Sequence, residues 1–428
     1  MMTNEFNERE PCRVDSAEVD VDFSTVSPAE RAARWAIWRV AGVGFARFAG
    51  LLHTVQDDLR GLFQADDITQ RAVLERANFQ QKILARLLEC LQSVDPEDAY
   101  AREVAALGPN GQLLAIGDPR YPRQLLDLRY PPVFLYLRGN LSGLSFDDTV
   151  AVVGSRAVQC AQAGLARRIA GDLAGEGVAT VSGGALGVDA AAHLGCLDAG
   201  APTIAVLAGG VDRPSPRRNA AIFERIVNQG ALISEYPLGV KPRAYHFQRR
   251  NELIAALSRA TVVVRAGLTS GTMLTARAAA EIGRPICAVP GDPDEPLAAG
   301  CNQLLVEGAA CVRDARDILA CVFGAAEDGT QLRLDSLRPK RSTRPRPRPP
   351  VARPPARRVV DLTVFSADAQ ALFKALDALA GKAGADVGRD ELKRHIDWAE
   401  SRLCPAMLEL ELGGAIHKKA GANRFRPA

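Results

Sequence analysis

Two glycine-rich turns near the middle of the chain have the residue types that bind phosphate. The first, Gly154-Ser155-Arg156, follows an apolar run at residues 150–153, and the second, Ser182-Gly183-Gly184, follows a similar run at residues 178–181. Glycine and serine let a phosphate approach the backbone closely, and N–H groups at such turns point toward anions. Arg156 could add a bidentate contact to that phosphate. We expect a phosphate-binding surface here.

A second basic segment places an aromatic ring among arginines. Lys241 precedes it, and the segment includes Phe247, Arg249, Arg250 and Asn251. Nucleobases stack on such rings while guanidinium groups hold phosphates, which suits single-stranded nucleic acid. The alternative is a solvated loop that caps a helix beginning near Asn251. Because the glycine turns also favour phosphate, we favour the nucleic-acid interpretation.

Asp189 and His193 lie four residues apart on one face of an expected helix, a spacing that could serve acid–base chemistry. The alternative, which we prefer, is an aspartate that braces the glycine turn and a histidine that packs against a sheet. The sequence has no GxxxxGK[ST] loop, and residues 183–187 do not match GxGxxG. No motif places a serine or cysteine nucleophile. We therefore name no catalytic residue.

Strand-like apolar runs alternate with helical segments through the centre of the chain. Besides the two above, they lie at residues 203–207, 232–234, 262–264 and 286–289. This alternation predicts an α/β fold with a doubly wound, mostly parallel sheet, whose ligands bind beyond the carboxyl ends of the strands. Ser270-Gly271-Thr272 follows the run at residues 262–264, and we include it in the candidate phosphate site. Two further short strands within residues 112–141 are expected to extend the sheet.

The composition limits the class of protein. The chain has 428 residues, 47% hydrophobic and 24% charged, so two or three globular domains are expected. A net charge of +3 is too small to diagnose nucleic-acid binding. The nine cysteines show no metal-binding spacing, so we expect no metal site and a reducing cytoplasmic location. We also expect no cofactor. We expect no signal peptide and no membrane span.

The N-terminal part divides into an expected disordered tail at residues 1–25 and a helical domain at residues 26–107. Ser27 is a suitable N-cap, followed by Pro28 and, three residues after the cap, by Glu30, as in a capping box. Residues 41–44 contain two glycines that interrupt the helical pattern. Such a glycine turn can touch a DNA backbone, but a helical bundle used for packing or partner contact is the interpretation we prefer.

The C-terminal part consists of an expected linker and a small domain. Residues 325–360 are rich in proline and arginine and cannot bury a core, so they form either a plain tether or one that adds phosphate contacts. Residues 361–428 predict three helices and a hairpin, as in a winged helix. The third helix carries Glu400, Glu409 and Glu411, so contact with protein and contact with duplex DNA are equally supported. Lys418, Lys419 and Arg424 are the candidate phosphate ligands there.

Six motifs occur together and in order within residues 113–319. They are GSR at 154–156, SGGALGVDAAAH at 182–193, SEYP at 234–237, RRN at 249–251, SGTMLTARAAAE at 270–281 and AVPG at 288–291. This set resembles the DNA-processing protein A family, also called DprA or Smf. The resemblance implies an extended Rossmann-like domain at residues 108–324, with an N-terminal helical domain of the SAM-like type. It also implies a homodimer that binds single-stranded DNA and loads the RecA recombinase during natural transformation, without being an enzyme.

The resemblance places the DNA pocket on the two glycine turns and the basic segment described above. The sequence departs from the family where FPxRNR is usual, because Gln248 replaces the proline and Glu252 replaces the final arginine. Ser215 stands for a customary tyrosine and Arg265 for a customary glutamate. A carboxylate at Glu252 would repel phosphate, and we expect Arg265 to restore some of the lost positive charge.

Two other functions remain open. Nucleoside-monophosphate glycosidases have similar folds and use a PGGxGTxxE motif, whose centre resembles residues 270–272. Here Thr275 occupies the position of the glutamate, and the nearest acid is Glu281, which counts against hydrolysis. The other possibility is a winged-helix regulator whose central domain senses a nucleotide.

Overall fold

We describe the fold from a computed structural model. It describes residues 26–140, 145–324, 362, 365–380, 386–396, 398, 400–413, 415–418 and 424–427. The expected tail, the expected linker and the turn of the expected wing lie outside the described residues. Among the residues that are described, no helix is both long enough and apolar enough to cross a membrane.

The chain forms two compact units. The first comprises the described residues up to Arg138 together with Gly209–Arg213 and Ile233–Lys241, and the second contains the rest. The helices of the first unit are α1 (Pro28–Trp38), α2 (Phe45–Thr54), α3 (Leu59–Gln64), α4 (Asp67–Arg76), α5 (Gln81–Ser93) and α6 (Pro96–Leu107). The helical pattern expected over residues 26–107 is therefore present, with its interruption between α1 and α2.

Helix α1 begins as its sequence predicts, but Glu30 has a different role. The Ser27 side chain accepts the Glu30 N–H (3.1 Å), and Pro28 occupies the first turn. The Glu30 carboxylate instead binds Arg34 Nε (2.8 Å) and accepts the N–H groups of Leu59 and Arg60 at the start of α3 (3.1 and 2.7 Å). It thus stabilises the N-terminus of a second helix and pairs the buried Arg34.

A nine-stranded sheet runs through the centre of the chain in the order β1-β2-β6-β5-β4-β3-β7-β8-β9. Its strands are β1 (Gly111–Ala115), β2 (Phe134–Gly139), β3 (Thr149–Gly154), β4 (Ala179–Ser182), β5 (Thr203–Val206), β6 (Ala231–Ser234), β7 (Thr261–Arg265), β8 (Ile286–Ala288) and β9 (Ala310–Cys311). The β1–β2 pair is antiparallel, whereas β3 pairs in parallel with both β4 and β7. The expected strands and the doubly wound topology are confirmed, and only the short β9 was not expected.

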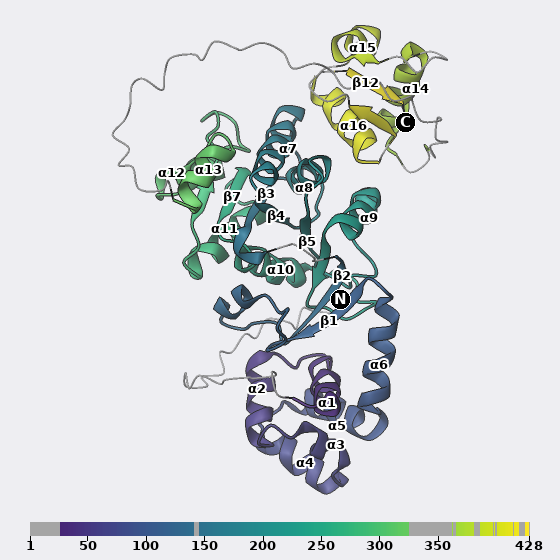
Figure 1. Ribbon diagram of the computed structural model, residues 1–428, viewed down its shortest axis with the longest axis vertical. Helices are drawn as coiled ribbons and strands as arrows, with labels where there is room; N and C mark the ends of the chain where they lie inside the picture. The colour runs from purple at the N-terminus through teal and green to yellow at the C-terminus, as the bar shows by residue number, and fades with distance from the viewer. Residues whose placement is uncertain are drawn as a thin grey trace, which may run out of the picture. The chain divides into compact units, whose positions relative to one another are not determined.

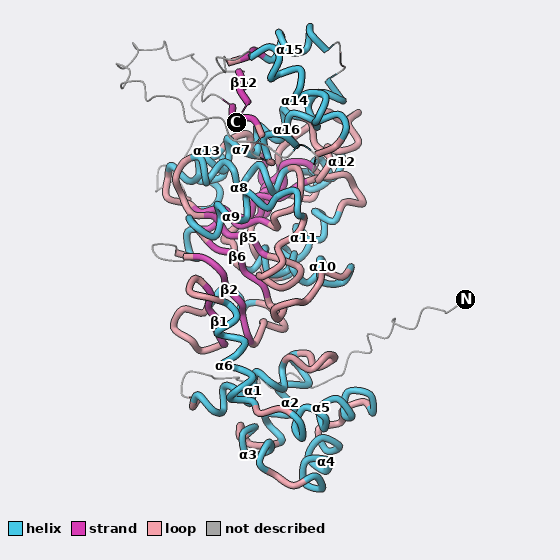
Figure 2. The backbone as a smooth tube through the Cα atoms, turned by 90° about the vertical axis from the view of Figure 1, so that its right-hand side faces the viewer, coloured by secondary structure: helices cyan, strands magenta, loops and turns pink. Residues whose placement is uncertain are grey.

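Helices cover both faces of the sheet in the second unit (Figures 1 and 2). Those helices are α7 (Cys160–Gly175), α8 (Val188–Asp198), α9 (Ala220–Gln229), α10 (Ala244–Ala256), α11 (Gly271–Glu281), α12 (Ala299–Val306) and α13 (Ala315–Val322). Helices α7 and α8 lie on one side of the sheet, and α10 and α11 lie together on the other. The strands between them are buried on both faces, which explains their continuous apolar sequences.

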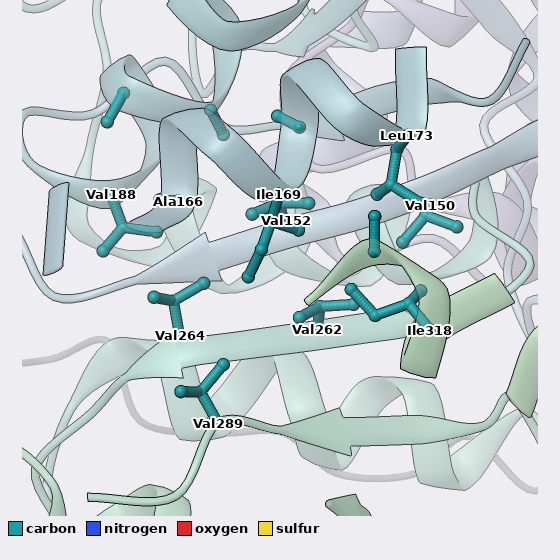
Figure 3. Close-up of a cluster of buried hydrophobic side chains, with 14 of the residues drawn as sticks. Val150, Val152, Ala166, Ile169, Leu173, Val188, Val262, Val264, Val289 and Ile318 are labelled. Carbon is teal, nitrogen blue, oxygen red and sulfur yellow. The ribbon is translucent and has the colours of Figure 1, made fainter. Parts of the chain in front are cut away.

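Alternate strand residues form the core on the α7 side. Val150 and Val152 of β3 and Val262 and Val264 of β7 pack against the apolar face of α7, which includes Ile169 (Figure 3). The residues between them in sequence point to the opposite face, as the two-residue period of a strand requires. This core fixes β3 beside β7 and brings the turns that follow both strands to one edge of the sheet.

The C-terminal elements are α14 (Ala367–Ala380), β10 (Val387–Gly388), α15 (Arg389–Ile396), α16 (Glu400–Leu412), β11 (Ile416–Lys418) and β12 (Arg424–Pro427). Strands β11 and β12 pair antiparallel, and Leu372, Leu403 and Leu410 belong to a separate core. The three helices and the hairpin agree with the sequence, and the winged-helix assignment stays a prediction. Glu409, expected to be surface acidity, accepts the N–H and O–H of Ser366 before α14 (2.8 and 2.6 Å).

We predict that Glu30→Gln lowers the free energy of unfolding by about 2 to 4 kcal/mol, because it leaves the buried Arg34 without its nearer carboxylate. Urea denaturation of the full chain measures this loss. Asp98→Asn is the control, since its ion pair with Arg102 is exposed (3.1 Å, side chains 60% and 74% exposed) and should contribute far less. Equal losses in the two variants would contradict the role assigned to Glu30.

Candidate nucleic-acid interface

The candidate site lies where β3 and β7 end, at the point where the strand order reverses. From β3 the chain proceeds through β4, β5 and β6 on one side and returns to β7 on the other. The Ser155 N–H donates to the Arg265 carbonyl (2.7 Å), which joins the ends of the two strands. Open α/β sheets bind ligands at such positions.

The first glycine turn presents one exposed charge. A Cβ on Gly154 would lie 2.6 Å from Val188 of α8, so the close approach of strand and helix requires glycine. The Ser155 hydroxyl bonds within its own turn, with its Oγ 3.2 Å from both the N and the O of Ala157. Arg156 is exposed, and its guanidinium carbon lies 5.6 Å from the centre of the Phe247 ring. The turn thus brings a cation to the aromatic ring expected from the sequence.

The basic segment is helical, so the alternative of a solvated loop that caps a helix beginning near Asn251 is wrong. Helix α10 begins at Ala244 and contains Phe247 through Asn251 in its first turns. Helical spacing separates the segment into two faces. Phe247 and Arg250 share one face (5.8 Å from guanidinium carbon to ring centre), whereas Arg249 pairs with Glu252 (2.8 Å). The arginines of the segment therefore do not form one cluster.

Arg250 is buried beneath the second glycine turn. A Cβ on Gly183 would overlap the Arg250 Nη1, so glycine is needed to accommodate the guanidinium group. Asp189 Oδ2 accepts the N–H groups of Gly183 and Ala185 (3.2 and 3.3 Å). Burial raises the pKa of the Asp189 carboxyl, and the charge of Arg250 opposes that rise. Asp189 therefore holds the turn in place, and Arg250, only 7% exposed, lies beneath the turn with its Nε buried and without a hydrogen-bond partner. The geometry thus places Arg250 under the site rather than at a solvent-facing phosphate contact.

The other residues of the second turn are also engaged within the protein. Ser182 is fully buried and donates to the Val152 carbonyl (2.7 Å). Gly184 has φ +65°, and its carbonyl accepts the Asn219 side-chain amide (2.8 Å). Asn219 is a support that the sequence analysis missed, because no local signal links residues 35 positions apart.

His193 of α8 is fully buried, and its Nδ1 lies 2.8 Å from the Oγ1 of Thr203 in β5. Burial, and then the charge of Arg250, lowers the pKa of His193 to about 3. The ring is therefore neutral near pH 7. These contacts confirm the structural interpretation of Asp189 and His193.

A third segment meets α10 at the start of α11. The Asn251 side-chain amide donates to the Gly271 carbonyl (3.2 Å), and Ser270 accepts the Thr272 N–H as the N-cap of α11 (3.2 Å). A Cβ on Gly271 would meet no atom within 4 Å, so the first turn of α11 is open. Lys241 is exposed and belongs to the first unit, so it is described apart from this site.

Glu252 and Arg265, the two positions where the charge differs from the one usual in the family, each pair with a neighbouring side chain of opposite charge. Glu252 pairs with Arg249, as described, and Arg265 contacts Glu295 (3.3 Å) and the Pro290 carbonyl (3.3 Å) with a side chain only 13% exposed. The expectation that Arg265 compensates for Glu252 is therefore wrong, because the charge of Arg265 is matched by its own carboxylate. The sequence analysis also missed Tyr245, which is 61% exposed and lies one turn before Arg249 on α10. Helical spacing would have placed it there once the start of α10 was known.

Comparisons with known proteins identify the family of this chain. The family described as DNA recombination-mediator protein A matches residues 112–323. Protein Smf of Synechocystis sp. is 34% identical over 292 residues, which are 67% of this chain and 72% of that protein. The chain belongs to the DprA/Smf family.

The similarity covers different shares of individual DprA/Smf relatives. A relative from Mycobacterium tuberculosis is 48% identical over 172 residues, which are 40% of this chain and 44% of that relative, so the chain spans less than half of its length. The X-ray structure of DNA processing protein A from Streptococcus pneumoniae is 29% identical with a TM-score of 0.57, covering 69% of this chain and 98% of that one. The α/β fold is therefore that of the family. In the described part of this DprA/Smf chain, no three His, Cys, Asp or Glu side chains gather in a potential metal site.

We predict that Gly183→Ala lowers the free energy of unfolding by about 1 to 3 kcal/mol, because the new methyl group must displace the buried Arg250. Gly164→Ala is the control, since a Cβ there meets no atom within 4 Å and alanine favours the interior of α7. Thermal and urea denaturation compare the variants. A Gly183→Ala protein as stable as the parent would show that Arg250 does not require this space.

We predict that stability falls between pH 7 and pH 5, partly through His193. Its pKa is about 3 in the folded chain and about 6.5 in the unfolded chain, so the unfolded chain takes up the proton first. Stability is complete above the unfolded pKa and is lost as the pH falls toward the folded one, by about 2 kcal/mol at pH 5. Urea titrations at several pH values should show a flatter dependence for His193→Gln. If the free energy of unfolding depends on pH equally in variant and parent, His193 does not cause the loss of stability.

Proposed function

We propose that this chain binds single-stranded DNA at the edge where β3 and β7 end. The observation that carries the proposal is the position of the exposed Arg156 over the half-buried Phe247 ring, beside two glycine turns and the open first turn of α11. An aromatic ring and a cation at one point can hold a base and its phosphate together. Membership of the DprA/Smf family supports this assignment.

The proposed contacts have different roles. Phe247 stacks on a base, while Arg156 binds the adjoining phosphate as a bidentate donor. The Ser270-Gly271-Thr272 turn offers the N-terminal N–H groups of α11 to another phosphate. The glycine turns let the protein backbone approach the DNA strand closely. Asp189 and Arg250 support the turn that contains Gly183. Arg249 contributes only when a phosphate competes with Glu252 for its guanidinium group.

The proposed cellular role is supported by the family rather than by the geometry. We propose that the chain acts in the cytoplasm as a homodimer, protects incoming single strands and loads the RecA recombinase onto them during natural transformation. The expected linker and the predicted winged helix would serve as a tether and as a DNA or protein contact. These roles rest on the DprA/Smf membership of the chain.

We propose binding rather than catalysis. The Asp189 carboxylate is occupied by two backbone N–H groups, and His193 is fully buried, so neither is presented to a substrate. The glycosidase alternative has Thr275 where a glutamate is needed, and Thr275 is buried in α11. Release of a free base from nucleoside monophosphates by the full chain would favour that alternative. Tight binding of a nucleotide without binding of oligonucleotides would favour the regulator.

We predict that Arg156→Gln weakens binding of a fluorescent single-stranded oligonucleotide about tenfold at low salt and reduces the salt slope by about one. Arg249→Gln should have a smaller effect because Glu252 already pairs its charge, and the double variant should bind more weakly than either single variant. Fluorescence anisotropy at two salt concentrations measures these changes.

Two further variants serve as controls for this measurement. Glu252→Gln removes the carboxylate partner of Arg249 and should strengthen binding, which reverses the sign of the effect. Arg316→Gln on α13 removes a 90% exposed guanidinium outside the site and should leave binding unchanged. If Arg156→Gln, Arg249→Gln and the double variant all bind like the parent, the proposed site is wrong.

A further inference from the structure

The glycine turn between α1 and α2 takes no part in the site proposed above. It is exposed at Ala41, Gly42 and Gly44, in the first unit. Gly42 has φ +99°, and a Cβ there would lie 3.0 Å from the Ile83 side chain of α5. Both the positive φ and the close approach to Ile83 require glycine at this position. At Gly44, by contrast, a Cβ would meet no atom within 4 Å. The turn is thus packed against α5 on one side and open on the other.

Cationic side chains converge on this turn from two other elements. Arg47 of α2 donates to the Gly42 carbonyl (3.2 Å), and Arg86 of α5 donates to the Ala41 carbonyl (3.1 Å). Each of these bonds uses one guanidinium nitrogen, Nη1, of a group that carries five N–H donors. Lys82 is exposed one helical turn before Arg86, and the exposed Arg39 lies two residues before the turn. We call Arg39, Arg47, Lys82 and Arg86 the basic turn cluster.

Two stretches of sequence that contain the cluster residues have no carboxylate. Residues 31–56 contain four arginines and no aspartate or glutamate, and residues 76–88 contain Arg76, Lys82 and Arg86 and again no acid. The nearest acid on α5 is Glu89, three residues after Arg86, and other acids lie on α6, for example Glu97 and Asp98. Arg47 and Arg86, from helices far apart in sequence, therefore bring positive charge to the same turn. A phosphodiester backbone is the ligand that such a surface favours.

We propose that the basic turn cluster binds the phosphate backbone of duplex DNA. Among the cluster and turn residues no ring is offered to solvent for stacking, since Trp35, which lies under Arg39, is fully buried. The half-buried Phe45 follows Gly44 and packs beside Tyr130, so the rings next to the turn contact each other. The four cations themselves recognise phosphates, which a duplex presents at fixed spacing while its bases stay paired. The Phe247 site, in contrast, offers a ring to an unpaired base. The chain would then hold a duplex segment and a single strand through different surfaces.

Gly44 allows a test that separates charge from fold. It is the N-cap of α2, with φ −99° and ψ 172°, a conformation that any residue adopts, and it makes no side-chain cap bond. Aspartate and asparagine are both favourable N-caps of similar size, so either should stabilise α2. Only Gly44→Asp places a negative charge at the turn. Gly44→Asn is therefore the matched control.

The experiment uses the full chain and two fluorescent probes, a duplex of about 20 base pairs and a single strand of equal length, at low and high salt. We expect the parent to bind the duplex at low salt. Gly44→Asp should weaken duplex binding about tenfold and reduce its salt slope by about one, while Gly44→Asn stays within about twofold of the parent. Removing Lys82 and Arg86 together, as Lys82→Gln and Arg86→Gln, should weaken duplex binding to a similar extent.

Several outcomes would overturn this inference. Failure of the parent to bind the duplex at low salt would refute duplex binding by the cluster. Equal duplex binding by Gly44→Asp and Gly44→Asn would refute it as well. Loss of single-strand binding alone in Gly44→Asp would assign the cluster to single strands instead. The Arg156→Gln variant keeps the two proposals separate, because it should weaken single-strand binding and leave duplex binding within about twofold. Unchanged single-strand binding in Arg156→Gln, Arg249→Gln and the double variant would refute the Phe247 site without affecting the basic turn cluster.

Discussion

The buried pair of Asp189 and Arg250 holds the candidate site together. Taking two charges out of water is costly, and the cost is offset only when the geometry is good and the remaining hydrogen-bonding groups are satisfied. Here the Asp189 carboxylate accepts two backbone N–H groups of the glycine turn. Arg250 fills the space that Gly183 leaves open, but its Nε is buried without a hydrogen-bond partner, so the attraction of Asp189 offsets only part of the cost of burying it. The pair therefore links α8, α10 and the turn after β4. Because Arg250 and Phe247 share a face of α10, the pair also fixes the ring that lies beneath Arg156.

Local neutralisation decides where positive charge reaches the surface of the site. Arg249 and Arg265 each have a carboxylate partner, Glu252 and Glu295, within 3.3 Å. Arg156 is the exposed cation that faces the ring. A site organised in this way depends more on stacking and on backbone donors than on accumulated charge, because paired cations release fewer counterions from a bound strand. This distribution agrees with a chain whose net charge is only +3.

The glycines of the two units serve different physical purposes. Gly183 accommodates a guanidinium group, and Gly154 allows a strand to approach a helix. Gly42 adopts a positive φ that L side chains rarely reach, whereas Gly44 has an ordinary conformation and open space around it. A glycine-rich turn in a sequence can therefore mean close packing, an unusual backbone or an open surface. Only the surrounding atoms distinguish these meanings.

The sequence alone determined the elements of this protein and their class. Apolar runs followed by glycine turns and helical stripes predicted the doubly wound sheet, and six ordered motifs indicated the DprA/Smf family, because such patterns are local. The tertiary structure decided that Phe247 lies within α10 and that Glu30 caps a second helix. It also decided that Arg250 is buried while Arg156 is exposed. Those outcomes depend on partners many residues away, and burial and ion pairing are properties of the assembled fold rather than of any local pattern.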